Sequence, residues 1–407
     1  MKKFLSLALI AAMLLSCVVL FGSCDSADTN KGDGNDDFKL GVICLHDEDS
    51  TYDLNFINGV LEAKEALGLR DDQVIIKRNI PESNACYEAA LDLVDEGCDV
   101  IFANSFGHET HILAAAKEKP EVQFCHATGT MAHTENLPNF HNAFASIYEG
   151  RYLAGVAAGM KLNQMIEEGK ITADQAKMGY VGAFTYAEVI SGYTSFYLGA
   201  KSVCPSVTMD VQFTGSWYDE NAERATANAL INGGCVLISQ HADSMGAPSA
   251  CEDKGIPNIS YNGSTQEHCP DTFIVSSRIN WAPYFQYICT QAMNGEAIAT
   301  DWTGTIATGS VVLTDVNTAV AAPGTVEAIA QITEELKNGT RHVFDTANFT
   351  VGGITLTSHM ADVDTDAAYT ADTEVIENGV FFESKHRSAP YFDLQIDGIT
   401  LLNTNFG

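Results

Sequence analysis

The chain has 407 residues, of which 46% are hydrophobic and 18% are charged, a composition typical of soluble globular proteins. This length exceeds what a single core usually holds, so two domains are expected. The formal net charge of -31 repels polyanions and argues against nucleic-acid polymers and anionic membrane surfaces as partners. A small neutral ligand is compatible with this charge.

The N-terminus has the features of an export signal. A basic start precedes an apolar stretch over residues 4–15, which is too short to span a bilayer alone. Small residues then precede Cys17 and Cys24, and both sites resemble the lipobox of bacterial lipoproteins. Cys24 is favoured because a polar, acidic run follows it. We expect a lipoprotein signal peptide over residues 1–23 and a flexible acidic tether over residues 24–37, with secretion without a lipid as the alternative.

Nine cysteines remain beyond the export segment. They are scattered singly, with no CxxC pair and no Cys/His spacing typical of zinc sites. Most are therefore expected to be small, buried apolar residues. An odd number cannot all pair, and a disulfide between Cys251 and Cys269 stays open.

Strands and helices alternate from residue 38 onward. Strands are predicted over residues 38–45, 73–77, 99–103 and 122–126, and helices around residues 56–67, 86–93 and 108–117. The helices are recognised by apolar residues at helical spacing. Such alternation specifies βαβ units with a parallel sheet and right-handed crossovers.

A second array of the same kind follows a polar interruption. A helix over residues 148–162 carries Gly155 and Gly159 four apart, which suits close packing, and the charged segment 163–177 then breaks the pattern. Further strands are predicted over residues 178–182, 208–213, 236–238, 257–261, 273–276 and 310–313, and helices around residues 189–200, 222–229, 247–253 and 326–336.

The two arrays predict two similar lobes with a ligand cleft between them. The first lobe is expected over residues 38–162 and the second over residues 163–300. Residues 301–407 are expected to supply crossover segments and a C-terminal tail that completes the lobes.

Polar side chains gather where the strand over residues 236–238 ends. Gln240, His241, Asp243 and Ser244 follow it closely. In open α/β sheets, ligands bind outside the carboxyl ends of the strands, so these residues are predicted to contact a ligand. The alternative is that an Asp or Ser here caps the next helix.

Aromatic residues follow other predicted strands as well, and each alone is more often core than contact. Together with polar neighbours such as Asn104 and Glu188, they describe a cleft that stacks a flat ring and hydrogen-bonds its edges. The predicted ligand-binding residues are Tyr52, Asn55, Ser105, Phe106, Phe184, Trp217, His241, Asp243, Asn262 and Trp281.

Motifs for catalysis or metal binding are not found. The run His108-Glu109-Thr110-His111 is not HExxH, because the second His comes one position early. There is no GxSxG elbow, no SxxK, no P-loop and no GxGxxG. We therefore expect no enzymatic activity, no metal and no cofactor.

Several stretches of the chain resemble the BMP family of substrate-binding lipoproteins, which includes bacterial purine nucleoside receptors. The resemblance rests on residues 50–56, 99–107, 151–159, 199–203, 214–219 and 240–244. It implies an α/β, two-lobed type I periplasmic-binding-protein fold, in which each lobe is a parallel sheet flanked by helices. It also implies a purine ligand and its delivery to an ABC transporter permease.

The loop over residues 50–56 departs from the nucleoside-receptor form, in which an Asp is followed closely by Ser-Phe-Asn-Gln. A free nucleobase such as adenine is therefore an alternative to a nucleoside such as adenosine. The sequence thus predicts a receptor anchored by lipid on the extracytoplasmic face of the cell membrane. Two alternatives are a sensory or adhesive surface lipoprotein with another ligand, and a nucleoside-cleaving enzyme.

Overall fold

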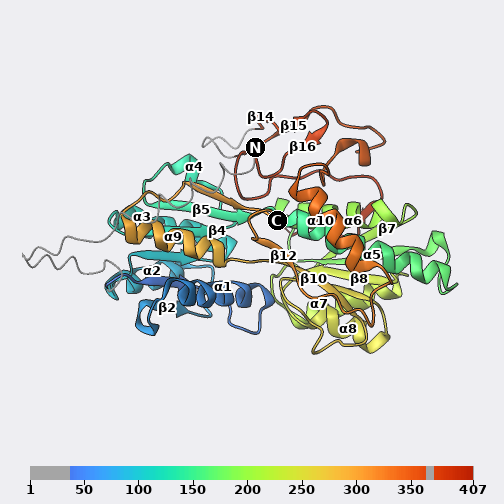
Figure 1. The fold of residues 1–407 in the computed structure, drawn as a ribbon, viewed down its shortest axis with the longest axis horizontal. Coiled ribbons are helices and arrows are strands. Elements are labelled where there is room, and N and C mark those ends of the chain that lie inside the picture. The colour runs from blue at the N-terminus through green and yellow to red at the C-terminus, as the bar shows by residue number, and fades with distance from the viewer. Residues whose placement is uncertain (1–36, 364–370, 407) are drawn as a thin grey trace, which may run out of the picture. The chain divides into compact units, whose positions relative to one another are not determined.

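The computed structural model describes residues 37–363 and 371–406. The predicted signal peptide, Cys24 and nearly all of the predicted tether lie outside the described residues. The described part contains two large sheets, each flanked by helices (Figure 1).

The first sheet has six parallel strands in the order β11-β5-β4-β3-β1-β2. These are β1 (Leu40–Ile43), β2 (Val74–Lys77), β3 (Val100–Ala103), β4 (Gln123–Ala127), β5 (Phe140–Ala145) and β11 (Asp301–Gly304). Its helices are α1 (Thr51–Leu67), α2 (Asn84–Asp95), α3 (Glu109–Glu118), α4 (Met131–Glu135) and α9 (Ala282–Asn294).

Both faces of this first sheet are buried, because successive strand residues point to opposite sides. Val42 belongs to the cluster that contains Phe56 of α1 and Phe285 of α9. Its neighbour Ile43 belongs to the cluster that contains Leu93 of α2 and residues of α3. The continuous apolar strands predicted from the sequence are explained by this two-sided burial.

The second sheet has seven strands in the order β12-β10-β9-β8-β6-β7-β17, of which only β12 runs antiparallel to its neighbour. These are β6 (Lys177–Gly182), β7 (Thr208–Phe213), β8 (Leu237–His241), β9 (Asn258–Tyr261), β10 (Phe273–Ile279), β12 (Val311–Leu313) and β17 (Ile399–Leu401). Its helices are α5 (Ile147–Glu167), α6 (Ala187–Val203), α7 (Glu220–Asn232), α8 (Gly246–Lys254) and α10 (Thr325–Lys337).

Helices α5 and α6 pack with their backbones in close contact. A Cβ atom on Gly155 would lie 2.0 Å from the carbonyl oxygen of Phe196, and one on Gly199 would lie 2.0 Å from that of Tyr152. Larger residues at these two positions would therefore force the helices apart. The spacing of Gly155 and Gly159 predicted this close approach.

The chain crosses between the two sheets three times within the described residues: after β5, after β10 and after β11. Hydrogen bonds tie the crossings together. The backbone N–H of Ser146 donates to Gly304 O (2.8 Å), and that of Asn280 donates to Ser310 O (2.7 Å). These crossings form a hinge between a first lobe, built on the first sheet, and a second lobe, built on the second sheet.

The lobes are not the continuous ranges 38–162 and 163–300 that the pattern predicts. Helix α5 packs against β10 and β12 of the second sheet, and α9 packs against α1 of the first lobe. The pattern also misses β5, α9 and β11. His141 and Asn142 interrupt the apolar run of β5, yet both are buried because they form hydrogen bonds to neighbouring segments.

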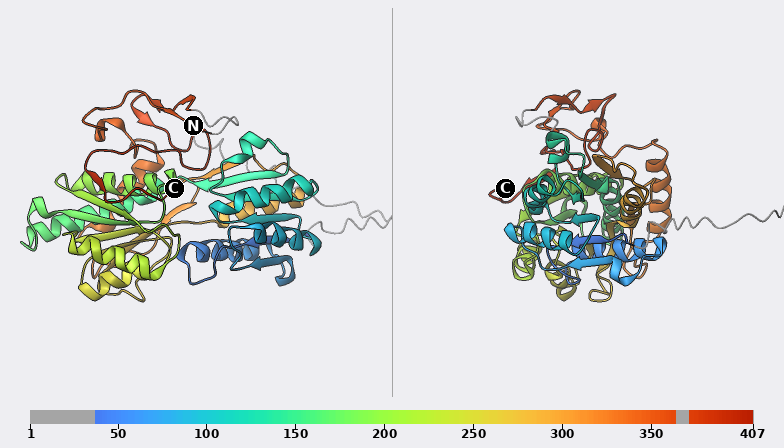
Figure 2. Two further views of the ribbon diagram at one scale, coloured as in Figure 1. Left: turned by 180° about the vertical axis from the view of Figure 1, so that it is seen from behind. Right: turned by 90° about the vertical axis from the view of Figure 1, so that its left-hand side faces the viewer.

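The C-terminal segment after α10 contacts both lobes (Figure 2). It contains the short strands β13 (Met360–Ala361), β14 (Thr373–Glu374), β15 (Ile376–Glu377) and β16 (Val380–Phe381) before β17. Ser388 N donates to Asp301 Oδ2 of β11 (2.6 Å), and Tyr193 OH of α6 donates to Gln395 Oε1 (3.3 Å).

All nine cysteines in the described residues are buried and unpaired. Cys251 and Cys269 are free thiols, so the disulfide left open by the sequence is not formed. Burial raises the pKa of the Cys269 thiol to about 11, and Glu252 and Asp253 add to this effect. No helix in the described ranges is long and apolar enough to cross a membrane.

Candidate functional site

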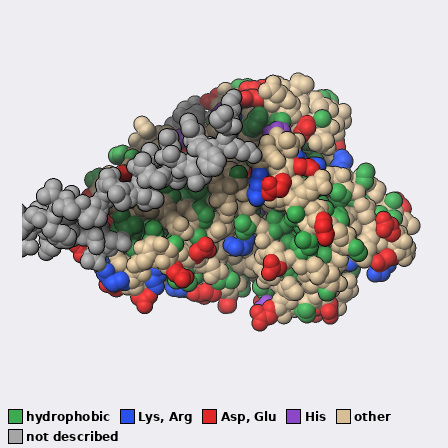
Figure 3. All heavy atoms as spheres, in the orientation of Figure 1, with side chains coloured by type: hydrophobic (Ala, Val, Ile, Leu, Met, Phe, Trp, Pro, Cys, Tyr) green, Lys and Arg blue, Asp and Glu red, His purple; other side chains and the backbone are tan. Residues whose placement is uncertain are grey.

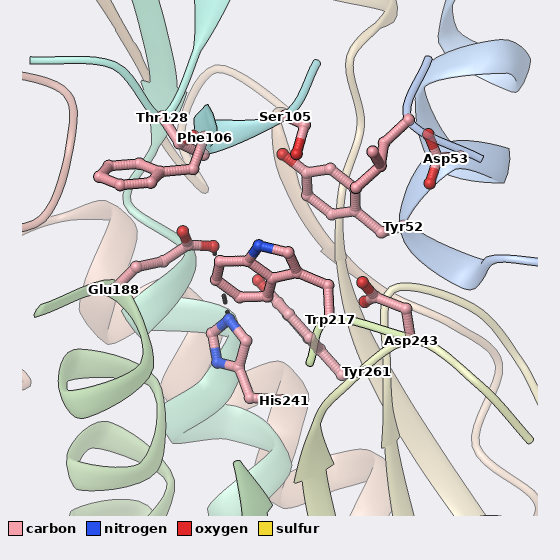
Figure 4. A pocket seen from close by; sticks show the side chains of 11 residues that line it. Tyr52, Asp53, Ser105, Phe106, Thr128, Glu188, Trp217, His241, Asp243 and Tyr261 are labelled. Carbon is pink, nitrogen blue, oxygen red and sulfur yellow. Dashed lines mark hydrogen bonds and ion pairs between the residues drawn. The ribbon is translucent and has the colours of Figure 1, made fainter. Parts of the chain in front are cut away.

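An interlobe pocket lies where the carboxyl ends of strands from both sheets meet (Figure 4). Its empty volume is about 370 Å³, part of which is open solvent. The lining residues are Leu45, Tyr52, Asp53, Ser105, Phe106, Thr128, Glu188, Trp217, His241, Asp243 and Tyr261. This is the position at which open parallel sheets bind ligands.

The start of α1 forms the first-lobe wall of the pocket. Ser50 caps this helix by accepting a hydrogen bond from Asp53 N (3.2 Å). Tyr52 OH donates to Asn104 O (2.7 Å), and Asn104 Nδ2 donates to Asp53 Oδ1 (2.7 Å). Burial raises the pKa of Asp53, but hydrogen bonds from His46 and Asn104 outweigh it and lower the pKa overall. Asp53 is thus an ionised group that fixes the wall.

His241, at the end of β8, forms part of the second-lobe wall. Its Nε2 lies 3.4 Å from Glu188 Oε1, and its Nδ1 lies 3.3 Å from Tyr180 OH. Burial lowers the pKa of His241, although Glu188 opposes this shift. The imidazole is therefore neutral near pH 7, with one nitrogen as donor and the other as acceptor.

A buried cation lies behind this wall. Arg151 of α5 is fully buried, and its Nη2 donates to Tyr180 OH (2.8 Å), Ser239 Oγ (3.1 Å) and Gln240 O (3.2 Å). Its guanidinium carbon lies 4.7 Å from the centroid of the Tyr261 ring. A guanidinium over an aromatic face is attractive, so Arg151 holds the ends of β8 and β9 in place.

Asp243 connects the two lobes through its backbone. Its carbonyl oxygen accepts a hydrogen bond from Thr51 N (3.2 Å), and its N–H donates to Trp217 O (2.9 Å). Its side chain is only 6% exposed. Burial raises the pKa of the carboxyl well above its ordinary value, and Glu223, Asp53 and Glu188 add to the shift while Asn262 opposes it.

The helix-cap alternative holds for neither Asp243 nor Ser244, because the N-cap residue of α8 is Met245 and this helix has no side-chain cap hydrogen bond. Ser244 Oγ accepts a hydrogen bond from Gly246 N (3.1 Å) at the start of α8. Glu223 in turn accepts from Ser244 N, which orders the loop after β8. The side chain of Asp243 makes no such contact and lines the pocket instead.

Aromatic rings from both lobes meet at the pocket. The Trp217 indole lies at the centre of the view in Figure 4, between Tyr52 and His241. Phe184 stands edge-on to Trp217, with ring centroids 4.9 Å apart, and stacks on Tyr186 at 5.2 Å.

Of the ten predicted contacts, six line the pocket: Tyr52, Ser105, Phe106, Trp217, His241 and Asp243. Asn55 and Asn262 lie outside this lining and hydrogen-bond to each other across the lobes (3.4 Å). Phe184 packs behind Trp217. Contrary to the prediction, Trp281 is core: it is 1% exposed and stacks on Phe56 at 4.3 Å.

The list of predicted contacts lacks five lining residues. Tyr261 ends a predicted strand, and Glu188 was singled out only as a polar neighbour, so the strand-end criterion could have included both. Leu45 and Thr128 lie at or just after the ends of predicted strands, so the same criterion could have included them, whereas Asp53 lies in the first turn of α1.

The described residues contain no group of three or more His, Cys, Asp or Glu side chains arranged to hold a metal ion. In the His108–His111 run, His108 Nε2 lies 2.9 Å from Ile80 O. Glu109 Oε1 accepts hydrogen bonds from Met131 N (2.8 Å) and Asn142 Nδ2 (3.0 Å). Both side chains are thus engaged in holding loops of the first lobe.

Two helix-flanked sheets joined by a hinge around an interlobe pocket define the periplasmic-binding-protein fold. Residues 42–339 match the family described as ABC transporter substrate-binding protein, PnrA-like. The match covers more than half of the chain, which therefore belongs to this family. The family consists of binding proteins and not enzymes, in agreement with the sequence-based expectation.

Curated relatives cover part of the chain. A purine-binding protein of Brucella abortus is 32% identical over 55% of this chain and 59% of its own. A Haloferax volcanii protein, whose name assigns it provisionally to glucose binding by an ABC transporter, is 34% identical over 46% of this chain and 44% of its own. The chain thus spans about half the length of these two relatives. An ABC transporter nucleoside-binding protein of Lactococcus lactis is 24% identical over 61% of this chain and 68% of its own.

Solved structures show the same fold at low sequence identity. A solute-binding protein from Aeropyrum pernix has a TM-score of 0.63 at 15% identity, covering 79% of this chain and 94% of its own. One from Conexibacter woesei has a TM-score of 0.60 at 18% identity, covering 75% and 98%. The predicted fold class is confirmed.

Proposed function

We propose that this protein is an extracytoplasmic receptor that binds a purine, as nucleoside or free base, in the interlobe pocket and delivers it to an ABC permease. The observation that carries the proposal is the combination in one pocket of aromatic rings with two buried hydrogen-bonding groups, His241 and Asp243. The names of the Brucella and Lactococcus relatives, purine-binding and nucleoside-binding, support this ligand class, whereas the name of the Haloferax relative points to glucose.

The two edge groups match a purine in their hydrogen-bonding chemistry. Adenine presents the N7 acceptor beside the N6 amino donor. The raised pKa of Asp243 favours its protonated form, which has one donor as well as acceptor capacity. A neutral His241 likewise has one donor and one acceptor. The pair therefore complements a neutral ring edge and needs no charge on the ligand.

Contacts between the lobes support a closing motion. Thr51 N and Oγ1 both lie within hydrogen-bonding distance of Asp243 O, at 3.2 and 3.3 Å, and the rings of His46 and Tyr218 are 5.3 Å apart. These bonds join residues of different lobes, so they break when the hinge opens. Closure around a ring would exclude water and strengthen each hydrogen bond at the site.

Tryptophan fluorescence tests the proposal. We expect adenine or adenosine, but not glucose, to change the emission of the purified protein, because a purine would contact Trp217. Trp281 is buried in the first-lobe core and Trp302 packs on Tyr284 with ring centroids 5.0 Å apart, so neither lies in the pocket. Trp217→Phe should abolish the change, whereas Trp302→Phe, the matched control, should preserve it.

Mass spectrometry of small molecules released from the protein on denaturation gives an independent measure. Recovery of a purine supports the receptor. Binding of glucose with no response to any purine would mean that the ligand is a sugar and not a purine. Release of free base from a nucleoside during incubation would contradict the binding-only role.

A second prediction concerns attachment of the protein to the membrane. Cys24→Ala should release folded protein from the membrane fraction into the medium, because the lipidated thiol would be lost. Cys17→Ala serves as the control, and immunoblotting of the two fractions measures the effect. Release by Cys17→Ala alone would assign the lipidation site to Cys17.

A further inference from the structure

A chain of hydrogen-bonding groups extends from the interior of the second lobe to the pocket and includes His241. Tyr180 OH lies 2.8 Å from Arg151 Nη2 and 3.3 Å from His241 Nδ1. On the other side of the imidazole, His241 Nε2 lies 3.4 Å from Glu188 Oε1, the contact that the dashed line in Figure 4 marks. The groups follow one another in the order Arg151, Tyr180, His241, Glu188. Only the last two line the pocket.

The two ends of this hydrogen-bond chain fix the direction of every bond in it. A guanidinium has donors and no acceptor, so Arg151 donates to the oxygen of Tyr180. The phenol proton is then directed to His241 Nδ1, which accepts it. A carboxylate accepts and has no donor, so the proton of the neutral imidazole must be on Nε2 to bond to Glu188. Both ends therefore require the same tautomer of His241.

The packing around His241 Nδ1 restricts it to this one partner. Helix α6 approaches the imidazole at Gly192, where a Cβ atom would lie 2.6 Å from His241 Nδ1 and 3.3 Å from Tyr180 OH. Both rings are buried. Within the part of the chain that the structure describes, Tyr180 OH is the hydrogen-bond partner of Nδ1 and no second one is present. The absence of a side chain at position 192 thus leaves room for the contact between the two rings.

Arg151 is held toward Tyr180 by its other bonds. The same nitrogen, Nη2, also donates to Ser239 Oγ (3.1 Å) and Gln240 O (3.2 Å). Burial is the main cause that lowers the pKa of His241, and the positive charge of Arg151 lowers it further, against the opposing effect of Glu188. The ring therefore has a single N–H at neutral pH, and its position decides what the pocket offers to a ligand.

We infer that Arg151 and Tyr180 are positioning residues that hold the proton of His241 on Nε2, so that the pocket offers a hydrogen-bond donor at this point and selects a base with a ring nitrogen or carbonyl oxygen there. Neither residue lines the pocket, so both act through His241. The inference rests on the proposed purine-binding function and specifies which part of the purine faces His241: an acceptor, and not the exocyclic amino group.

The proton on Nε2 is available to a ligand. Its contact to Glu188, at 3.4 Å, is longer than the usual range of about 2.7–3.2 Å for an N–H···O bond. An acceptor on the ligand can therefore take this proton in a shorter bond, while Nδ1 stays bonded to Tyr180.

Nitrogen-15 NMR of protein labelled at its histidines tests the tautomer directly. The chain has 11 histidines, so the His241→Gln variant identifies the His241 resonances by their loss. Near pH 7 the wild-type protein should show a protonated Nε2 and an unprotonated Nδ1. Adenine or adenosine should shift the Nε2 resonance and leave Nδ1 unprotonated. A proton on Nδ1 in the wild type, or a mixture of the two tautomers, overturns the inference.

Glu188→Gln separates the two ends of the hydrogen-bond chain, because an amide both donates and accepts and no longer dictates the tautomer. Arg151 and Tyr180 alone should then keep the proton on Nε2. Adding Tyr180→Phe to Glu188→Gln should give a mixture of tautomers. Tyr193→Phe in the same background is the matched control. Its ring is also buried, 5.9 Å from that of Tyr180, and its hydroxyl donates to Gln395. A mixture already in Glu188→Gln overturns the role of Arg151 and Tyr180, and this single variant decides the matter if the double variant does not fold.

Calorimetric titration with analogues of adenine in which N1, N3 or N7 is replaced by C–H tests the selection of an acceptor. The wild-type protein should bind at least one analogue about tenfold or more weakly than adenine, because a buried donor loses its partner. In the double variant of Tyr180 and Glu188 this loss should shrink by about threefold or more, since part of the population then presents an unprotonated Nε2.

The outcomes separate the inference from the proposed function. Equal affinity for adenine and every analogue, or a loss that is the same in the double variant, overturns the selection of an acceptor while purine binding stands. A wild-type protein that binds no purine overturns the proposed function and the ligand assignment with it.

Discussion

Asp243→Ala is expected to weaken purine binding about tenfold to a hundredfold while the unliganded protein stays folded. Removing one partner of a buried hydrogen bond costs about 1–3 kcal/mol, and each tenfold in affinity corresponds to about 1.4 kcal/mol. The Asp243 carboxyl is not a helix cap, so the loss should fall on the ligand and not on α8. Calorimetric titration and thermal melting measure the two effects separately.

Asp243→Asn is the matched variant, because it keeps the shape and removes the ionisation. The folded protein raises the pKa of Asp243, so above the ordinary value of 3.8 the unfolded chain loses this proton more readily and stability falls. The Asn side chain does not ionise and removes this loss of stability. The melting temperature of the Asp243→Asn variant at pH 7 should therefore exceed that of the wild type. A lower melting temperature with unchanged affinity would instead assign Asp243 a structural role.

Glu383→Gln should remove a pH-dependent loss of stability. Glu383 is 1% exposed, and neither carboxyl oxygen makes a hydrogen bond of normal geometry within the described residues. Burial raises its pKa to about 8, with Glu188 and Glu149 adding to the shift and Ser191 and Arg387 opposing it. Glu383 is therefore protonated in the folded protein at neutral pH.

The sign follows from proton uptake on folding. Between the ordinary pKa of 4.5 and the folded pKa of about 8, the unfolded chain is ionised at this position and the folded protein is protonated. Stability is therefore fully present below pH 4.5 and falls as the pH rises through this window, by about 1.4 kcal/mol per unit and a few kcal/mol in all. Gln stays neutral and should show no such loss.

Urea unfolding at pH 5 and pH 8.5, in reducing buffer, measures the difference between the variant and the wild type. Glu65→Gln is the control, because Glu65 is exposed on α1. The Glu383→Gln variant should become more stable relative to the wild type as the pH rises, and the control should not. A difference that is the same at both pH values would mean that Glu383 is already ionised in the folded protein.

The position of the binding site could be predicted because the ends of the apolar strands can be recognised in the sequence. His241 and Asp243 follow an apolar strand directly, and the ends of parallel strands meet along one edge of the sheet. Residues at such ends line the pocket whether or not their neighbours in space are known. The same reasoning covers Tyr52, Ser105, Phe106 and Trp217.

The failures arise where the chain changes lobe. Trp281 follows β10 just as Trp217 follows β7, but the chain crosses the hinge after β10 and carries Trp281 into the first-lobe core. A local sequence pattern does not show in which lobe the chain continues after a strand ends. The lobe boundaries fail for the same reason, because α5 and α9 pack on the lobe opposite to the one that chain order suggests.

The surface agrees with the charge of the sequence. Asp and Glu side chains are spread over the visible face of both lobes and not gathered in one patch (Figure 3). A face on which acidic groups are spread in this way offers little to polyanions. The net charge of -31 thus favours solubility and disfavours polyanionic partners. The chemistry of the pocket is set instead by a few buried groups.

The buried thiols have a consequence for the lifetime of the protein outside the cell. The nine cysteines of the described residues are free and shielded in the folded state, and burial holds the pKa of those such as Cys44 and Cys289 far above neutrality, so little reactive thiolate is present. Unfolding in an oxidising medium exposes all of them at once, and incorrect disulfides then trap the chain. Survival is therefore governed by the rate of unfolding and not by the equilibrium between folded and unfolded forms.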